Sequence, residues 1–169
     1  NLYGHINRDM LQFDFVNNLN GDIAFADKIK KMGGRIFNVP MIRNGAAEHY
    51  KAMNDLFKNN KYEALYYQAN RKLKNADIFK YAKKYNVPYR ILHSHNTREL
   101  DESKLNKIRV KLTEAQLNNY ITDRFACSRE AGEWMFPGAE EVVVVNNGVD
   151  SKVFDYDKTV RESLRRDKF

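Results

Sequence analysis

The residues best suited to chemistry form one run near the middle of the chain, Arg90-Ile91-Leu92-His93-Ser94-His95-Asn96-Thr97. The apolar residues before it predict a strand over 88–93, and this run would lie at the strand's carboxyl end. His93 and His95 are two residues apart, so they point to the same side if the strand continues through them. A histidine there can act as a general base or donate a hydrogen bond to a phosphate or carbonyl oxygen.

Three structural alternatives remain open for this run. His93 lies nearer the strand core and could be a buried residue with a satisfied ring. Asn96 and Thr97 could simply cap the following turn. The two histidines could also bind a metal, but they would need a further ligand, and the other histidines, His5 and His49, are distant in sequence. We therefore predict no metal site.

Two further segments are predicted at carboxyl ends of strands, where an open α/β sheet binds its ligands. Ser128 closes a strand over 124–127 and opens a helix whose positive end could receive an anion, although an ordinary cap is favoured. The neighbouring Cys127, the one cysteine of the chain, is predicted to be a small buried residue. The Asn146-Asn147-Gly148-Val149-Asp150 segment predicts a tight turn that places Asn147, Gly148 and Asp150 at the rim of the crevice.

The positive charge is concentrated in one stretch. The chain carries 29 Lys and Arg against 22 acids, and residues 71–111 alone hold twelve basic residues against four acidic ones. Within it, a helix over 103–122 carries Leu105, Ile108, Leu112 and Ala115 at helical spacing, which predicts an apolar stripe docked on the sheet. The same predicted helix has a basic face formed by Lys104, Lys107, Arg109 and Lys111. This face would be solvated or would rest on an anionic membrane or phosphate-bearing acceptor; nucleic acid is disfavoured because no aromatic-and-basic binding pattern is present.

The order of elements predicts an α/β fold with a Rossmann-like doubly wound parallel sheet and helices on both faces. The strands are expected over 11–16, 35–39, 63–67, 88–93, 124–127 and 142–145, and helices between and after them. The last strand, Val142–Val145, is apolar on both faces, which is typical of a buried strand. Such a sheet usually begins with its central strand, so we expect an opening strand upstream of Asn1.

Several function classes lack support in the sequence. No apolar run approaches the roughly 20 residues of a membrane span. The first residues have neither the basic start nor the apolar stretch of a signal peptide. Neither a G-x-G-x-x-G fingerprint nor a Walker A motif is present.

Four segments together resemble the N-terminal domain of a bacterial family four glycosyltransferase of the capsular or exopolysaccharide type. They are Gln12-Phe13-Asp14-Phe15-Val16, the run over 90–97, Phe125-Ala126-Cys127-Ser128 with Ala131-Gly132-Glu133-Trp134-Met135-Phe136, and Asn146-Asn147-Gly148-Val149-Asp150 with Phe154. The family has the GT-B fold, in which two Rossmann-like domains face each other across a cleft.

The resemblance implies that residues 1–150 form the acceptor-binding domain, without its first strand, and that 151–169 lead to a donor-binding domain. The reaction would be retaining, metal-independent sugar transfer from a nucleotide-sugar to a lipid-linked saccharide, and the nucleotide-sugar would be a substrate, not a cofactor. His95 would contact the transferring sugar or stabilise charge near the acceptor. His93, Ser94, Asn96, Thr97, Ser128, Asn147 and Gly148 would line the cleft. The implied location is cytoplasmic, with peripheral contact to the inner membrane face.

The chain departs from the family pattern at one informative place. The usual histidine pair after the third strand is replaced by Tyr66-Tyr67-Gln68. Two other functions stay open: a non-catalytic partner subunit that recruits a separate donor-binding half, and an unrelated Rossmann-like nucleotide-binding domain. Nucleotide binding by this chain alone would favour the last.

Overall fold

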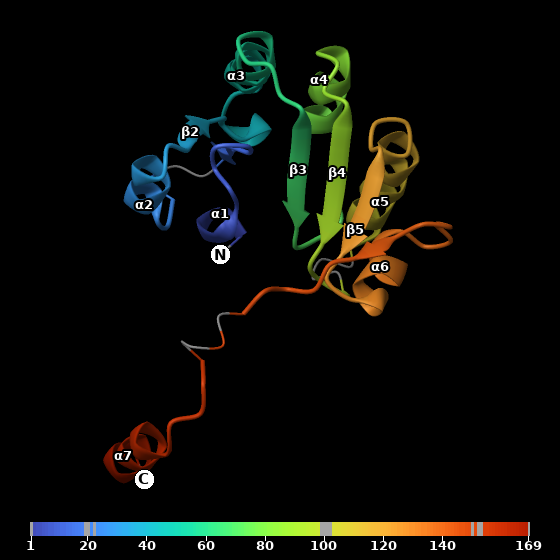
Figure 1. The fold of residues 1–169 in the computed structure, drawn as a ribbon. Coiled ribbons are helices and arrows are strands. Elements are labelled where there is room, and N and C mark those ends of the chain that lie inside the picture. The colour runs from blue at the N-terminus through green and yellow to red at the C-terminus, as the bar shows by residue number, and fades with distance from the viewer. Residues whose placement is uncertain are drawn as a thin grey trace. The chain divides into compact units, whose positions relative to one another are not determined.

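The fold is a computed structural model that describes residues 2–18, 21, 23–98, 103–149, 151 and 154–168. Its elements alternate between helices and strands for most of the chain, as Figure 1 shows. In order they are α1 (Leu2–His5), β1 (Asp14–Asn17), α2 (Ala26–Lys31), β2 (Arg35–Asn38), η1 (Ile42–Asn44), α3 (Ala46–Lys58), β3 (Ala64–Ala69), α4 (Asp77–Lys84), β4 (Tyr89–Ser94), α5 (Lys104–Leu117), β5 (Asp123–Ala126), α6 (Arg129–Met135), β6 (Val143–Val144) and α7 (Lys158–Lys168).

The chain divides into two compact units. Residues Gln12–Asn146 form the core unit, which holds every strand named above. Asn1–Leu11 and Asn147–Phe169 form the terminal unit, which contains α1 and α7. The site described below belongs to the core unit.

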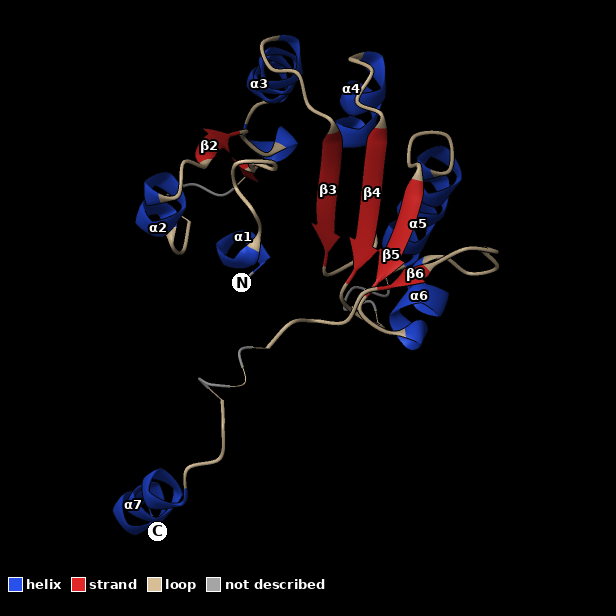
Figure 2. Ribbon diagram, viewed as in Figure 1, coloured by secondary structure: helices blue, strands red, loops and turns tan. Residues whose placement is uncertain are grey.

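All strand pairs in the core unit are parallel. β1 pairs with β2, and a four-stranded sheet has the order β3-β4-β5-β6. Helices lie between consecutive strands, as parallel pairing requires, and Figure 2 shows β3, β4 and β5 running in one direction with helices beside them. The predicted α/β class, with Rossmann-like parallel sheets flanked by helices, is confirmed.

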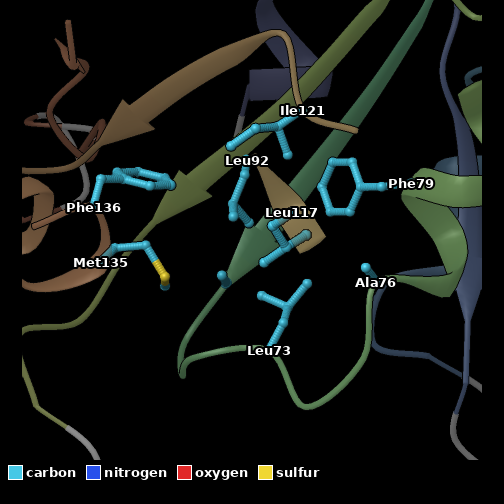
Figure 3. Packing of buried hydrophobic residues seen from close by; sticks show 9 residues of the cluster. Leu73, Ala76, Phe79, Leu92, Leu117, Ile121, Met135 and Phe136 are labelled. Carbon is cyan, nitrogen blue, oxygen red and sulfur yellow. The ribbon is translucent and has the colours of Figure 1, made fainter. Parts of the chain in front are cut away.

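The four-stranded sheet packs against α4, α5 and α6 through one buried cluster, part of which Figure 3 shows. Phe79 of α4 and Leu92 of β4 are almost completely buried at its centre. The other members are Ala69, Leu73, Ala76, Leu117, Ile121, Met135 and Phe136. A second cluster joins β2, α3 and α4 and includes Val39, Met53, Leu56, Phe57, Ala82 and Val87.

Local sequence signals determine where these helices begin and end. The Ser103 hydroxyl accepts the Asn106 N–H at 3.3 Å, and the Ser128 hydroxyl accepts the Ala131 N–H at 3.2 Å, so both serines cap their helices as expected. Gly33 ends α2 with a φ of 87°, a conformation that glycine adopts without a steric penalty. The Gly34 N–H bonds back to the Ile29 carbonyl at 3.0 Å, which completes the helix terminus.

The prediction of a buried last strand is wrong. β6 contains two residues, and Val143 and Val144 are 52% and 51% exposed. In the described part of the chain this strand lies at the end of the sheet and pairs with β5 alone. An apolar run indicates a buried strand, but it carries no information about the strand's position in the sheet order, and an edge strand is covered less than a central one.

The predicted orientation of α5 is also wrong. Leu105, Ile108 and Leu112 were expected to dock on the sheet, yet they are 71%, 58% and 62% exposed. The buried side of α5 instead consists of Asn106, Val110, Thr113 and Leu117. The helix carries apolar residues on two faces, so the hydrophobic pattern alone could not identify the side that docks.

Candidate functional site

Two neighbouring parallel strands bring four polar side chains together at their carboxyl ends. β3 contributes Tyr66 and Gln68, and β4 contributes His93 with His95 directly after it. Gln68 is in register with His93, and residues two apart on a strand share a face. Residues 66, 68, 93 and 95 therefore form one continuous polar surface, which we call the histidine cluster.

His93 is the buried member of the histidine cluster, with 3% of its surface exposed. Its Nδ1 lies 2.5 Å from the Tyr66 hydroxyl, and the Tyr66 and Phe125 rings pack around it. Burial lowers the pKa of His93 below its usual value, and the neighbouring His95 lowers it further. His93 is accordingly neutral near pH 7.

The second ring nitrogen of His93 is the unusual feature of the cluster. Nε2 is buried and makes no hydrogen bond within the described part of the chain. Backbone groups of Ala126 and Val145 lie near enough to oppose the fall in pKa, but neither meets hydrogen-bond geometry at Nε2. If the Tyr66 hydroxyl donates to Nδ1, the neutral ring carries its proton on the buried Nε2.

His95 is half-buried and lies against His93, with the ring centroids 4.1 Å apart. Its Nε2 is hydrogen-bonded to Oε1 of Gln68. An amide oxygen only accepts, so this bond places the proton on Nε2 and leaves Nδ1 unprotonated in the neutral ring. The His95 backbone N–H donates to the Ala69 carbonyl at 2.9 Å, which extends the pairing of β3 and β4 to the histidine itself. Gln68 thus fixes the ring, and the sheet fixes the backbone.

The other residues of the run differ in their surroundings. Ser94 is 0% exposed and donates its hydroxyl to the Asn96 carbonyl at 3.2 Å. Asn96 donates to the Asn70 carbonyl at 3.1 Å and accepts the Thr97 N–H at 2.8 Å, so it links the loops after β3 and β4. Thr97 is exposed. Ser94 and Asn96 therefore shape the turn, and their participation in a cleft stays a prediction.

Of the remaining cleft candidates, Ser128 belongs to the core unit and is not part of the histidine cluster. Ser128 is occupied in capping α6, and the adjacent Cys127 is half-buried with a free thiol. Asn147 and Gly148 are exposed and belong to the terminal unit. Asp150 lies outside the described residues. The roles of these residues in a cleft stay predictions.

Sequence reasoning missed the two partners of the histidines. Tyr66 and Gln68 were noted only as replacements for a histidine pair, yet they make the side-chain hydrogen bonds to His93 and His95. A signal for them existed, because both pairs have a spacing of two at the ends of consecutive predicted strands. Parallel pairing of those strands would have placed them side by side.

Three other features of the described chain bear on its function. No group of three metal-ligating side chains occurs among the residues that the structure describes, and no helix there is long and apolar enough to cross a membrane. A surface cavity of about 550 Å³ lies on the helix-covered side of the sheet. Its charged lining consists of Lys72, Glu114, Arg124, Glu140 and Glu141, and Leu92 and Phe136 contribute to its apolar lining.

Comparisons with known proteins identify one informative relative. A protein of Bacillus subtilis (strain 168) named "Putative glycosyltransferase EpsF" is 27% identical over an alignment of 161 residues that covers 91% of this chain. The likeness is to a glycosyltransferase. The match covers 41% of that protein, so the chain spans about two fifths of its relative's length.

The other comparisons found no match. No family model matches the chain. No solved structure matches it. The relative supports a glycosyltransferase-like relationship for this chain.

Proposed function

We propose that this chain is the acceptor-binding part of a glycosyltransferase that builds a cell-surface polysaccharide. The observation that carries the proposal is the histidine cluster at the carboxyl ends of β3 and β4. This is the edge at which open α/β sheets bind ligands. The likeness to a protein named as a glycosyltransferase supports the choice of reaction.

The proposed reaction moves a sugar from a nucleotide-sugar to an acceptor hydroxyl. The bond between the anomeric carbon and the diphosphate breaks, a bond to the acceptor oxygen forms on the same face, and the acceptor proton leaves with the diphosphate. The donor would bind mainly to a second domain beyond the residues of this chain. The acceptor would be a lipid-linked saccharide, and the transfer would need no metal ion.

His95 is the proposed catalytic residue. Gln68 holds its ring by the bond to Nε2, so the ring is oriented before a substrate arrives. From that position His95 would hydrogen-bond the transferring sugar or stabilise charge next to the acceptor. His93 would remain neutral and would line the site beside His95, with its ring held by the Tyr66 hydroxyl.

The experiment compares His95→Ala with the unchanged protein in its full-length form. Transfer is followed from a panel of radiolabelled UDP-sugars onto a bacterial membrane lipid extract, and UDP-sugar affinity is measured separately by calorimetry. We expect His95→Ala to lower the transfer rate about 100-fold or more, within the range for loss of a positioned acid–base or hydrogen-bonding group. UDP-sugar affinity should change little.

Gln68→Leu distinguishes positioning from chemistry. It removes the partner of His95 but leaves the imidazole, so we expect a smaller loss of rate than in His95→Ala. Lys51→Ala is the control, because Lys51 is exposed on α3 and belongs to neither of the strands that hold the histidine cluster. Near-normal turnover of His95→Ala would remove its catalytic role. Tight binding of UDP-sugars to residues 1–169 alone would overturn the acceptor-binding assignment.

A further inference from the structure

The outward face of α5 is apolar, although it was expected to be buried. Leu105, Ile108 and Leu112 are 71%, 58% and 62% exposed, and Ala115 is exposed beside them. With about 100° between successive helical residues, these four positions lie on one strip opposite the buried residues. We call this strip the apolar stripe. The helix has 14 residues, so at about 1.5 Å per residue it is about 21 Å long.

Basic residues border the apolar stripe on both sides. Lys104, Lys107 and Lys111 follow one border at a spacing of three to four residues, and Arg109 lies on the other. All four side chains are exposed. The acid within α5, Glu114, is paired with Lys72 at 2.5 Å. The acids Glu99, Asp101 and Glu102 precede the helix and lie outside the described residues.

This combination fits a lipid surface better than a protein partner. Lysine is depleted at protein–protein interfaces, where charged side chains must lose water. Helices that lie in the membrane interface combine large aliphatic residues with bordering Lys and Arg, which reach the anionic headgroups while the aliphatic residues enter the acyl boundary. The apolar stripe is also small, with three large aliphatic side chains and one alanine, which suits shallow insertion of a single helix.

We propose that α5 docks this unit on a bilayer containing anionic phospholipid, with Leu105, Ile108 and Leu112 inserted and the bordering cations on the headgroups. The proposal goes beyond the proposed function and stands without it, because it rests only on the exposure and charge of α5. It places the chain where a lipid-linked molecule would be found, whatever reaction follows.

The experiment measures co-sedimentation of the purified chain with vesicles. One set contains phosphatidylcholine with about 30% phosphatidylglycerol, which gives the vesicles a strongly negative surface. The other set contains phosphatidylcholine alone. Two triple variants are compared: Leu105→Gln/Ile108→Gln/Leu112→Gln and Lys104→Gln/Arg109→Gln/Lys111→Gln. The control is Lys28→Gln/Lys30→Gln/Lys31→Gln, which removes the same charge from exposed positions on α2.

We expect binding to the anionic vesicles that weakens as salt rises, since salt screens charges in contact with water. Each basic residue near such a surface contributes about fivefold to the partition coefficient, so the basic triple variant should bind at least tenfold more weakly. The apolar triple variant should lose at least as much, and the α2 control should lose much less.

Three results would overturn the proposal. The first is absence of binding to anionic vesicles. The second is equal weakening by the α5 and α2 charge variants, which would indicate attraction by net charge alone. The third is a dimer in sedimentation velocity that the apolar triple variant abolishes while vesicle binding is unchanged, because the stripe would then be covered by a second copy. Circular dichroism of each variant checks that the fold is retained.

Discussion

Buried His93 makes the stability of the core unit depend on pH in a definite direction. Its side chain is 3% exposed, so burial favours the neutral form, and the ring of His95, with its centroid 4.1 Å away, disfavours a positive charge on His93. Both effects lower the pKa of His93 in the folded protein. In the unfolded chain the imidazole titrates near its usual value of about 6.5.

The sign follows from proton uptake. As pH falls through about 6.5, the unfolded chain binds a proton at His93, while the folded protein does not until its lower pKa is reached. The stability contributed by neutral His93 is therefore complete above about pH 7 and is lost as pH falls below 6.5. One proton can change the free energy of unfolding by at most about 1.4 kcal/mol per pH unit, which sets the ceiling for this single residue.

The assay is urea unfolding between pH 5.0 and 7.5, with the unchanged chain and His93→Gln measured side by side. We expect the free energy of unfolding to fall toward acid pH in the unchanged chain and the fall to be shallower in His93→Gln. The proton resonances of the His93 ring should titrate with a midpoint below 6.5. A midpoint at or above 6.5, or the same pH slope in both proteins, would refute the reasoning.

The remaining predictions concern the core and the helix ends, and each is measured as a change in the free energy of urea unfolding. Phe79→Ala should destabilise the protein by about 3–5 kcal/mol, because Phe79 is completely buried and leaves a cavity. Ser103→Ala and Ser128→Ala should each cost about 1 kcal/mol through loss of a helix cap. Gly132→Val should lower the free energy of unfolding by about 1–3 kcal/mol, because even a Cβ atom added at Gly132 would lie 3.1 Å from Cγ1 of Val142. An unchanged stability would mean that α6 can move away from Val142.

The element order could be predicted from the sequence because it depends on local signals. Serine caps at Ser103 and Ser128, and the glycine after α2 at Gly33, are short-range features that a sequence displays directly. The strands predicted from hydrophobic runs agree with the strands of the core unit to within a few residues at each end. The parallel pairing then followed from the alternation of strands and helices.

The two errors in the fold arose where a choice depended on tertiary packing. For β6, the four consecutive valines are compatible with either a central or an edge position, and the sheet order decided between them. For α5, Leu105 and Val110 are both apolar but lie on different faces. The docked face contains Asn106 and Thr113, which a hydrophobicity pattern would exclude from a core.

The candidate site could be predicted only in part, because the sequence identified the two histidines but not what holds them. Hydrogen-bond partners on a neighbouring strand are not adjacent in sequence: Tyr66 and His93, and likewise Gln68 and His95, are each separated by 27 positions. Only the register of β3 against β4 makes them neighbours.

The resemblance predicts a histidine pair where this chain has Tyr66 and Gln68, and the two residues present have a consistent physical explanation. Additional imidazoles beside His93 would place more ionisable rings against one that is already kept neutral by burial and by His95. A phenol and an amide instead provide hydrogen-bonding groups that carry no charge near pH 7 and leave the two histidine rings as the ionisable groups of the cluster. The amide accepts from His95 without competing for its proton, whereas a glutamate at position 68 would stabilise the charged ring. The surroundings of the His95 ring are thus set jointly by the Gln68 amide on β3 and the His93 ring on β4, and both are fixed by the pairing of the same two strands.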